Sequence, residues 1–212
     1  IIIDGIPIAF TAPAVIGQFL RTSDDYSQSF LTASLLRALR YFLMILSIFL
    51  PAFYISITTF HHEMIPSELA MSIIMAKEGV PYPSFFEVFL MLIAFETLIE
   101  SGRRLPKSIG QAVSIVGALV VGEAAVNAKF ISPSVVVIIA ITAISGFAMP
   151  NQDFSNALRI WRFIMAVLAS LLGLVGMSFG AILMLYALAS IETFGVPYLS
   201  PYAATQGKDL KD

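Results

Sequence analysis

The sequence predicts an all-α membrane protein, a polytopic helical bundle of about five transmembrane helices. Amphipathic interfacial helices and a short β remnant at the N-terminus complete the predicted fold. Hydrophobic residues make up 58% of the chain and charged residues only 12%, and the mean hydropathy is +0.88. Soluble domains average about 45–50% apolar and 25% charged residues. The apolar residues also gather in blocks of roughly 20, the length that one helical crossing needs.

Composition and motifs exclude several classes of protein. The net charge of −2 and the thinly spread Lys and Arg leave no basic surface for nucleic acid. Without cysteine there is neither a disulfide nor a thiolate site. The HHE at 61–63 lacks the second histidine of a zinc motif, because position 66 is a proline. With no phosphate loop or nucleophile motif, we expect no enzyme, no bound metal and no cofactor.

The first 40 residues are expected to lead into the membrane. Asp4-Gly5 between β-branched runs is typical of a hairpin turn, so residues 1–20 are interpreted as the end of a largely missing soluble N-terminal domain. The chain begins without Met inside an apolar segment, and we expect a fragment of something longer. Residues 21–40 are predicted to form an amphipathic linker helix, with Ser23 as its N-cap.

Residues 41–202 are predicted to be the transmembrane domain, and 203–212 the start of a C-terminal tail. A first crossing at 41–59 contains Pro51, which should kink it. A short interfacial helix at 66–79 follows. Pro, Gly or charged residues then bound three further crossings, at 84–101, 109–127 and 132–149.

The last predicted helix, about 158–191, is longer than one ordinary span. It is tilted, projects beyond the bilayer, or breaks near Gly173 and Gly176. If the first four helices each cross once, three groups of basic residues fall on one side, which is expected to be cytoplasmic: Arg37 and Arg40, then Arg103, Arg104 and Lys107, and then Arg159 and Arg162. The loop between the first two crossings and Lys129 then face outward. An unbroken last helix would leave the C-terminus outside, whereas a broken one could return it to the cytoplasm.

Small residues mark two helices as packing elements. In 109–127 they recur at every fourth position, the spacing that lets helix backbones approach closely in lipid. In the last helix, two glycines share a face and predict the same kind of contact. The packing residues are Gly110, Ser114, Ala118, Gly122, Gly173 and Gly180.

Glu123 and Asn127 lie one turn apart beside that small-residue stripe. An ionisable group within a span is expensive, so its default interpretation is functional. A ring of such groups around an oligomer axis would attract cations, and both residues are candidates for an ion path. The alternative is that Glu123 lies near the outer interface and meets water or Lys129.

Three glutamates lie in the helix predicted at 84–101. Glu96 and Glu100 share a face, and Glu87 falls nearly opposite. We expect Glu100 to pair with Arg104 at the cytoplasmic end and Glu87 to be interfacial. Glu96 sits a turn deeper and is the third candidate for the ion path, against the alternative of an interhelical hydrogen bond.

Three longer segments carry a resemblance to a known family. They are LPKSIGQAVSIVGALVVGEAAV at 105–126, ISPSVVVIIAITAISGFAMPN at 131–151 and FGVPYLSP at 194–201. Together they resemble the membrane domain of the spore germination receptor A subunits, the GerA family of endospore-forming bacteria. The resemblance is collinear over nearly the whole chain.

The resemblance implies a multi-pass protein of the inner membrane of the bacterial spore, with the receptor B and C subunits as partners. It also implies a homo-oligomer around a path for monovalent cations that opens when a nutrient germinant binds. A non-conducting scaffold that assembles the other subunits is the first alternative. A secondary transporter is a further one, although no inverted repeat is visible.

Overall fold

The computed structural model describes residues 12–103, 117, 120–200 and 202, which are mostly helical, as predicted. Residues 120–127 are helical as well. The elements, in chain order, are α1 (Ile16–Phe19), η1 (Ser23–Tyr26), α2 (Phe30–Thr59), η2 (His62–Met64), α3 (Ser67–Ala76), α4 (Ser84–Arg103), α6 (Pro133–Phe147), α7 (Gln152–Ala189), β1 (Glu192–Thr193) and β2 (Val196–Pro197). By length and composition two of these helices, α2 and α7, could cross a membrane. The count of about five spans stays a prediction.

The predicted place of the β remnant is wrong. Among the described residues, strands occur only near the C-terminal end, where β1 and β2 pair antiparallel. The turn predicted at Asp4-Gly5 lies outside the described residues. Residues 16–19 form the short helix α1 instead of a strand. The small C-terminal hairpin turns through Phe194 and Gly195, both at positive φ.

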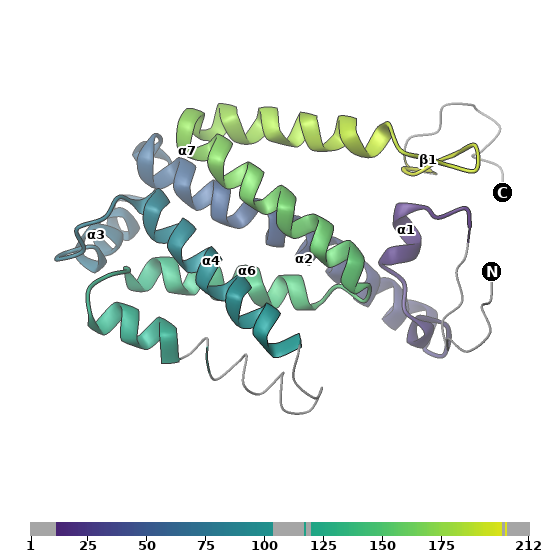
Figure 1. The fold of residues 1–212 in the computed structure, drawn as a ribbon, viewed down its shortest axis with the longest axis horizontal. Coiled ribbons are helices and arrows are strands. Elements are labelled where there is room, and N and C mark those ends of the chain that lie inside the picture. The colour runs from purple at the N-terminus through teal and green to yellow at the C-terminus, as the bar shows by residue number, and fades with distance from the viewer. Residues whose placement is uncertain (1–11, 104–116, 118–119, 201, 203–212) are drawn as a thin grey trace.

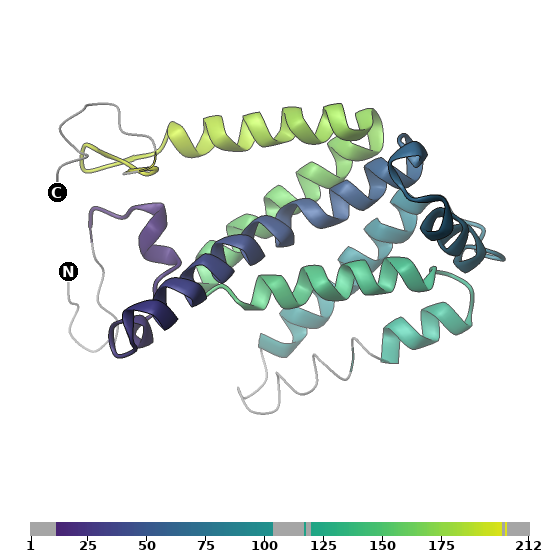
Figure 2. The same ribbon diagram turned by 180° about the vertical axis from the view of Figure 1, so that it is seen from behind.

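Helix α2 is the central element of the bundle. Its most extensive contacts are with α7 and then with α6, and Figures 1 and 2 show it running diagonally between them. Helix α4 packs mainly on α6 and also contacts α2. Buried apolar side chains from all four helices fill these contacts: Ile48, Ala52 and Ile55, Val88, Met91 and Leu92, Val135 and Ile139, and Met165, Ala166 and Ala169.

The start of α2 differs from the prediction. Ser23 is not the N-cap of a long helix; it begins η1, which Thr22 and Asp25 close in a reciprocal capping box. The long helix begins at Phe30 and runs without interruption through the boundary predicted between residues 40 and 41. The division into a linker and a transmembrane domain therefore stays a prediction, with no break in α2 to mark it.

An ion pair fastens η1 to α2. Arg40 donates to both carboxylate oxygens of Asp25, at 2.7 and 2.8 Å, and to the backbone carbonyl of Leu20 at 3.1 Å. The hydrogen bonds from Arg40, with those from Thr22, hold the pKa of Asp25 well below its ordinary value. The chain before α2 is thereby bound to Arg40, about three turns into that helix.

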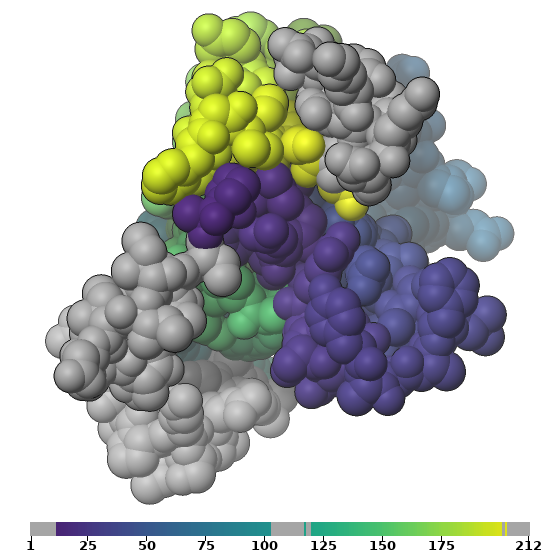
Figure 3. Space-filling view, turned by 90° about the vertical axis from the view of Figure 1, so that its right-hand side faces the viewer, coloured from purple at the N-terminus to yellow at the C-terminus, as the bar shows by residue number. Residues whose placement is uncertain are grey.

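The C-terminal hairpin closes over the same region. The backbone N–H of Ile16 donates to the carbonyl of Tyr198 at 2.9 Å. The ring of Phe19 lies 5.6 Å from that of Phe154, at the start of α7, and 5.9 Å from that of Tyr198, after its end. Figure 3 shows the purple N-terminal residues directly below the yellow hairpin. Helix α1 therefore contacts the start of α7 and the hairpin that follows its end.

Helix α7 is broken at Gly173, one of the three outcomes that the sequence left open. Gly173 has φ 63° and ψ −138°, outside the helical region. The second half folds back along the first, so that α7 starts and ends toward the same end of the molecule (Figures 1 and 2). A Cβ added at Gly180 would lie 2.6 Å from Met165 Sδ, which shows how closely the two halves approach. The buried Gly176 faces Leu168 in the same contact.

Substitution of Gly173 by alanine should destabilise the broken helix. A Cβ there would lie 3.1 Å from both Phe60 Cβ and His61 Cε1, in a conformation that only glycine adopts readily. We expect Gly173→Ala to cost about 1–3 kcal/mol. The measurement is the melting temperature of the purified protein in detergent. Gly195→Ala is the control, since Gly195 also has positive φ but open space around its Cβ position. Equal losses in the two variants would contradict a close contact at Gly173.

Candidate functional site

A buried arginine on α7 is bound to a backbone carbonyl of α2. Arg162 is 5% exposed, and its Nε donates to the carbonyl oxygen of Ser47 at 2.7 Å. That carbonyl would ordinarily accept from the N–H four residues later in the helix. The residue there is Pro51, which has no N–H. Arg162 therefore supplies the donor that Pro51 removes.

The same arginine joins two further helices. Its Nη1 lies 3.5 Å from Oε1 of Glu96 on α4, and Nη1 of Arg159 lies 3.1 Å from Glu96 Oε2. On α6, a Cβ added at Gly146 would lie 3.2 Å from Arg162 Nη2, so α6 approaches the guanidinium closely at a glycine. Side chains or backbone of α2, α4, α6 and α7 thus meet around Arg162; we call this the arginine junction.

The contacts of Glu96 match the packing alternative more closely than a place on an ion path. Its carboxylate faces the two arginines of α7, with 21% of the side chain exposed. Its role in ion conduction stays a prediction. The expected pair between Glu100 and Arg104 cannot be followed, because Arg104 lies outside the described residues.

Glu87 has a role that the sequence reasoning missed. It was expected at the membrane–water interface, yet its side chain is fully buried within the protein. Its Oε2 accepts from the backbone N–H of Ser132, the N-cap of α6, at 2.7 Å. Its Oε1 lies 3.1 Å from Lys77 Nζ, which also donates to Ser84 Oγ at 2.6 Å. Lys77 is the sole Lys or Arg between positions 41 and 102, a signal that could have indicated a specific partner.

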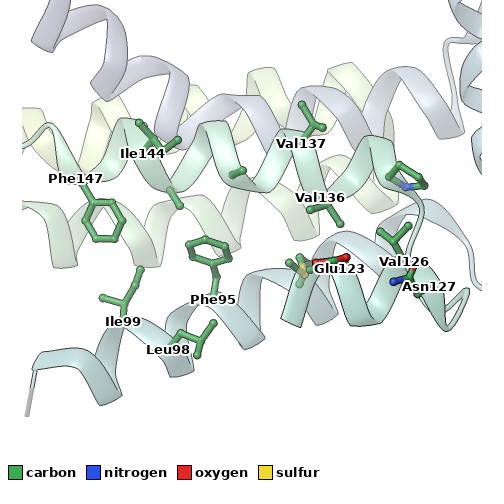
Figure 4. A pocket seen from close by; sticks show the side chains of 15 residues that line it. Phe95, Leu98, Ile99, Glu123, Val126, Asn127, Val136, Val137, Ile144 and Phe147 are labelled. Atoms are coloured by element: carbon green, nitrogen blue, oxygen red, sulfur yellow. The ribbon is translucent and has the colours of Figure 1, made fainter. Parts of the chain in front are cut away.

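Glu123 and Asn127 lie together on one wall of a cavity. The cavity has a volume of about 750 Å³ and lies between α4, α6 and the helical residues 120–127. Its lining is otherwise almost entirely apolar. Figure 4 shows Glu123 and Asn127 toward one end and Ile99 and Phe147 toward the other. Within the described part of the chain, no group pairs with the Glu123 carboxylate, which is exposed.

The predicted candidates therefore separate into two places. Glu123 and Asn127 share the cavity wall, whereas Glu96 belongs to the arginine junction. Of the small-residue stripe, Gly122 is buried against Val136 Cγ1, which would lie 3.1 Å from an added Cβ. Gly110, Ser114 and Ala118 lie outside the described residues. No group of three metal-binding side chains occurs in the ranges that the structure describes.

These features define a mostly helical protein whose buried ionic contacts join apolar helices. The family model described as Bacillus/Clostridium GerA spore germination protein matches residues 1–212. The chain belongs to the GerA family of spore germination proteins.

Individual relatives agree with this assignment. The chain is 44% identical over its full length to spore germination protein KA of Bacillus subtilis, covering 39% of that protein. It is 39% identical over its full length to spore germination protein GerLA of Bacillus cereus, covering 43% of it. It is 38% identical over 99% of its length to the uncharacterized membrane protein YfkQ of Bacillus subtilis, covering 41% of it. The chain thus spans about two fifths of these relatives. No solved structure matches it.

The arginine junction predicts an energetic coupling between Pro51 and Arg162. Arg162→Met should destabilise the protein by about 3–5 kcal/mol, because it leaves the buried Ser47 carbonyl without its donor and removes one of the two arginines that face Glu96. In a Pro51→Ala background the restored N–H can pair with Ser47, so Arg162→Met should cost about 1–3 kcal/mol less. Thermal or denaturant unfolding of the four proteins measures this coupling. Strictly additive losses would show that Arg162 does not serve the proline-freed carbonyl.

A second coupling should join Glu87 and Lys77. Glu87→Gln keeps the acceptor for the Ser132 N–H but leaves Lys77 without a counter-charge. We expect a loss of about 1–3 kcal/mol, limited because the Lys77 side chain is 25% exposed. Adding Lys77→Met should recover part of it. Glu68→Gln on the exposed face of α3 is the matched control, and melting temperatures report all three variants. A loss no larger than that of Glu68→Gln would argue against the buried pair.

Proposed function

We propose that this chain is the membrane domain of a germinant receptor A subunit, which oligomerises in the spore inner membrane as a germinant-gated cation channel. Membership of the GerA family supports a role in germination. The observation that carries the channel proposal is the exposed Glu123 carboxylate beside Asn127, in a chain whose other exposed faces are largely apolar. The B and C subunits of the receptor are the proposed partners.

In this proposal several copies of the chain bring Glu123 and Asn127 around one axis. A carboxylate ring attracts cations and repels anions, and the amide oxygen of Asn127 adds a neutral ligand one turn away. The permeant ion is a monovalent cation. The helices cross the membrane several times, and the fold-back of α7 at Gly173 returns the C-terminal hairpin to the side from which α7 started.

A non-conducting scaffold is the second candidate, and the contacts of Glu87 and Glu96 favour it. Both carboxylates are bound by cations or backbone donors from other helices, as in a protein whose ionic groups serve packing. Reconstituted oligomers that carry no current with or without germinant would support this alternative.

The channel proposal predicts that removing the charge of Glu123 slows ion release from spores. In the full-length receptor, Glu123→Gln should lower the rate of monovalent cation release after germinant addition by about tenfold, the lower end of electrostatic focusing by charged pores. Ion release is followed with a flame photometer or an ion-selective electrode. Asn127→Leu should add to the effect because it removes the neighbouring acceptor.

Glu63→Gln, in the exposed turn before α3, is the control for a change of charge away from the cavity. Immunoblots of spore membranes must show equal amounts of each variant. Unchanged release from Glu123→Gln spores at equal protein levels would contradict an ion path at Glu123.

A further inference from the structure

The cavity beside Glu123 is long and narrow. Its lining follows α6 from Pro133 to Phe147, which at 1.5 Å per residue is about 21 Å. Half of the hydrocarbon thickness of a bilayer is about 15 Å. The cavity is therefore long enough to hold the chain of a lipid from one leaflet, from its headgroup to its end.

The volume of the cavity suits one hydrocarbon chain better than a whole helix. Dividing 750 Å³ by this length gives a mean cross-section of about 36 Å². An α-helix with side chains is about 10–12 Å wide and needs a cross-section of about 80–110 Å². A helix from a second copy of the chain could insert single side chains but could not occupy the cavity. One extended hydrocarbon chain fits it.

The two ends of the cavity differ in polarity in the way that a lipid does. Glu123 and Asn127 lie toward one end, and Ile99, Ile144 and Phe147 lie toward the other, which we call the apolar end (Figure 4). An ammonium group has three donors and a positive charge, which the carboxylate and the amide oxygen can accept. A headgroup with phosphate as its sole charged group would be repelled by Glu123.

We propose that the cavity binds one acyl chain of an aminophospholipid from the bilayer, with the headgroup ammonium on Glu123 and Asn127. The proposal goes beyond the channel function and does not depend on it, because lipid occupancy can be measured without ion flux. In the channel, a seated ammonium neutralises Glu123, so the lipid and a permeant cation compete for the same carboxylate.

The test uses the full-length protein in nanodiscs of equal parts phosphatidylethanolamine and phosphatidylglycerol. Either lipid is added in trace amounts with a photoreactive diazirine near the end of one chain, and labelled peptides are mapped by mass spectrometry. We expect the phosphatidylethanolamine probe to label the apolar end, at Ile99, Ile144 or Phe147, in preference to the phosphatidylglycerol probe. Glu123→Gln should reduce this preference about tenfold, the value of one charge-assisted hydrogen bond.

Ala140→Trp places a large ring in the cavity wall and should abolish labelling of the apolar end. Ile141→Trp is the matched control, because Ile141 is exposed on α6 and outside the lining. If Ala140→Trp does not fold, the comparison of the two probes on the unsubstituted protein decides alone. Equal labelling by both probes, or no labelling of the apolar end, would overturn the proposal.

Discussion

The carbonyl oxygen of Ser47 is the constraint around which the bundle is arranged. Pro51 deprives it of its helical partner, and a buried carbonyl left without a donor is costly. The Nε of Arg162 donates to this carbonyl oxygen at 2.7 Å, and this fixes where α7 must cross α2. Since the guanidinium is charged, it then requires Glu96 from α4 close by. The missing N–H of Pro51 thus helps to determine where α7 and α4 pack.

Polar contacts of this kind matter more as the surroundings become more apolar. Between helices in lipid there is little hydrophobic driving force, and close packing with specific hydrogen bonds decides how they associate. Three such contacts hold the described residues at separate points. Asp25 and Arg40 join η1 to α2, the arginine junction joins the middle of the bundle, and Glu87 joins the segment after α3 to the start of α6. The apolar side chains pack in the space between these three ionic contacts.

Periodicity and composition predicted the helical class and the extent of most helices, and they included a break near Gly173 among three alternatives for the last helix, because these features depend on local sequence. The ionic partners could not be predicted, since they depend on which helix faces which. Arg162 was read only as a marker of orientation, and Glu87 as an interfacial residue, although both are buried. A proline in one helix and a buried arginine 111 positions later give no periodic signal. The β element was misplaced because β-branched residues near the N-terminus suggested a strand, whereas the pairing formed at Glu192–Pro197.

The aromatic contacts of Phe19 link α1 to two segments that lie far apart in the sequence. Its ring packs against Phe154, where α7 begins, and against Tyr198, which follows β2. Because the two halves of α7 fold back on each other at Gly173, the ring of Phe19 is packed between the start of α7 and the hairpin that follows it. Displacing α1 would therefore separate both contacts at once. Phe60 and His61 pack against the break at Gly173, at the opposite end of the two halves.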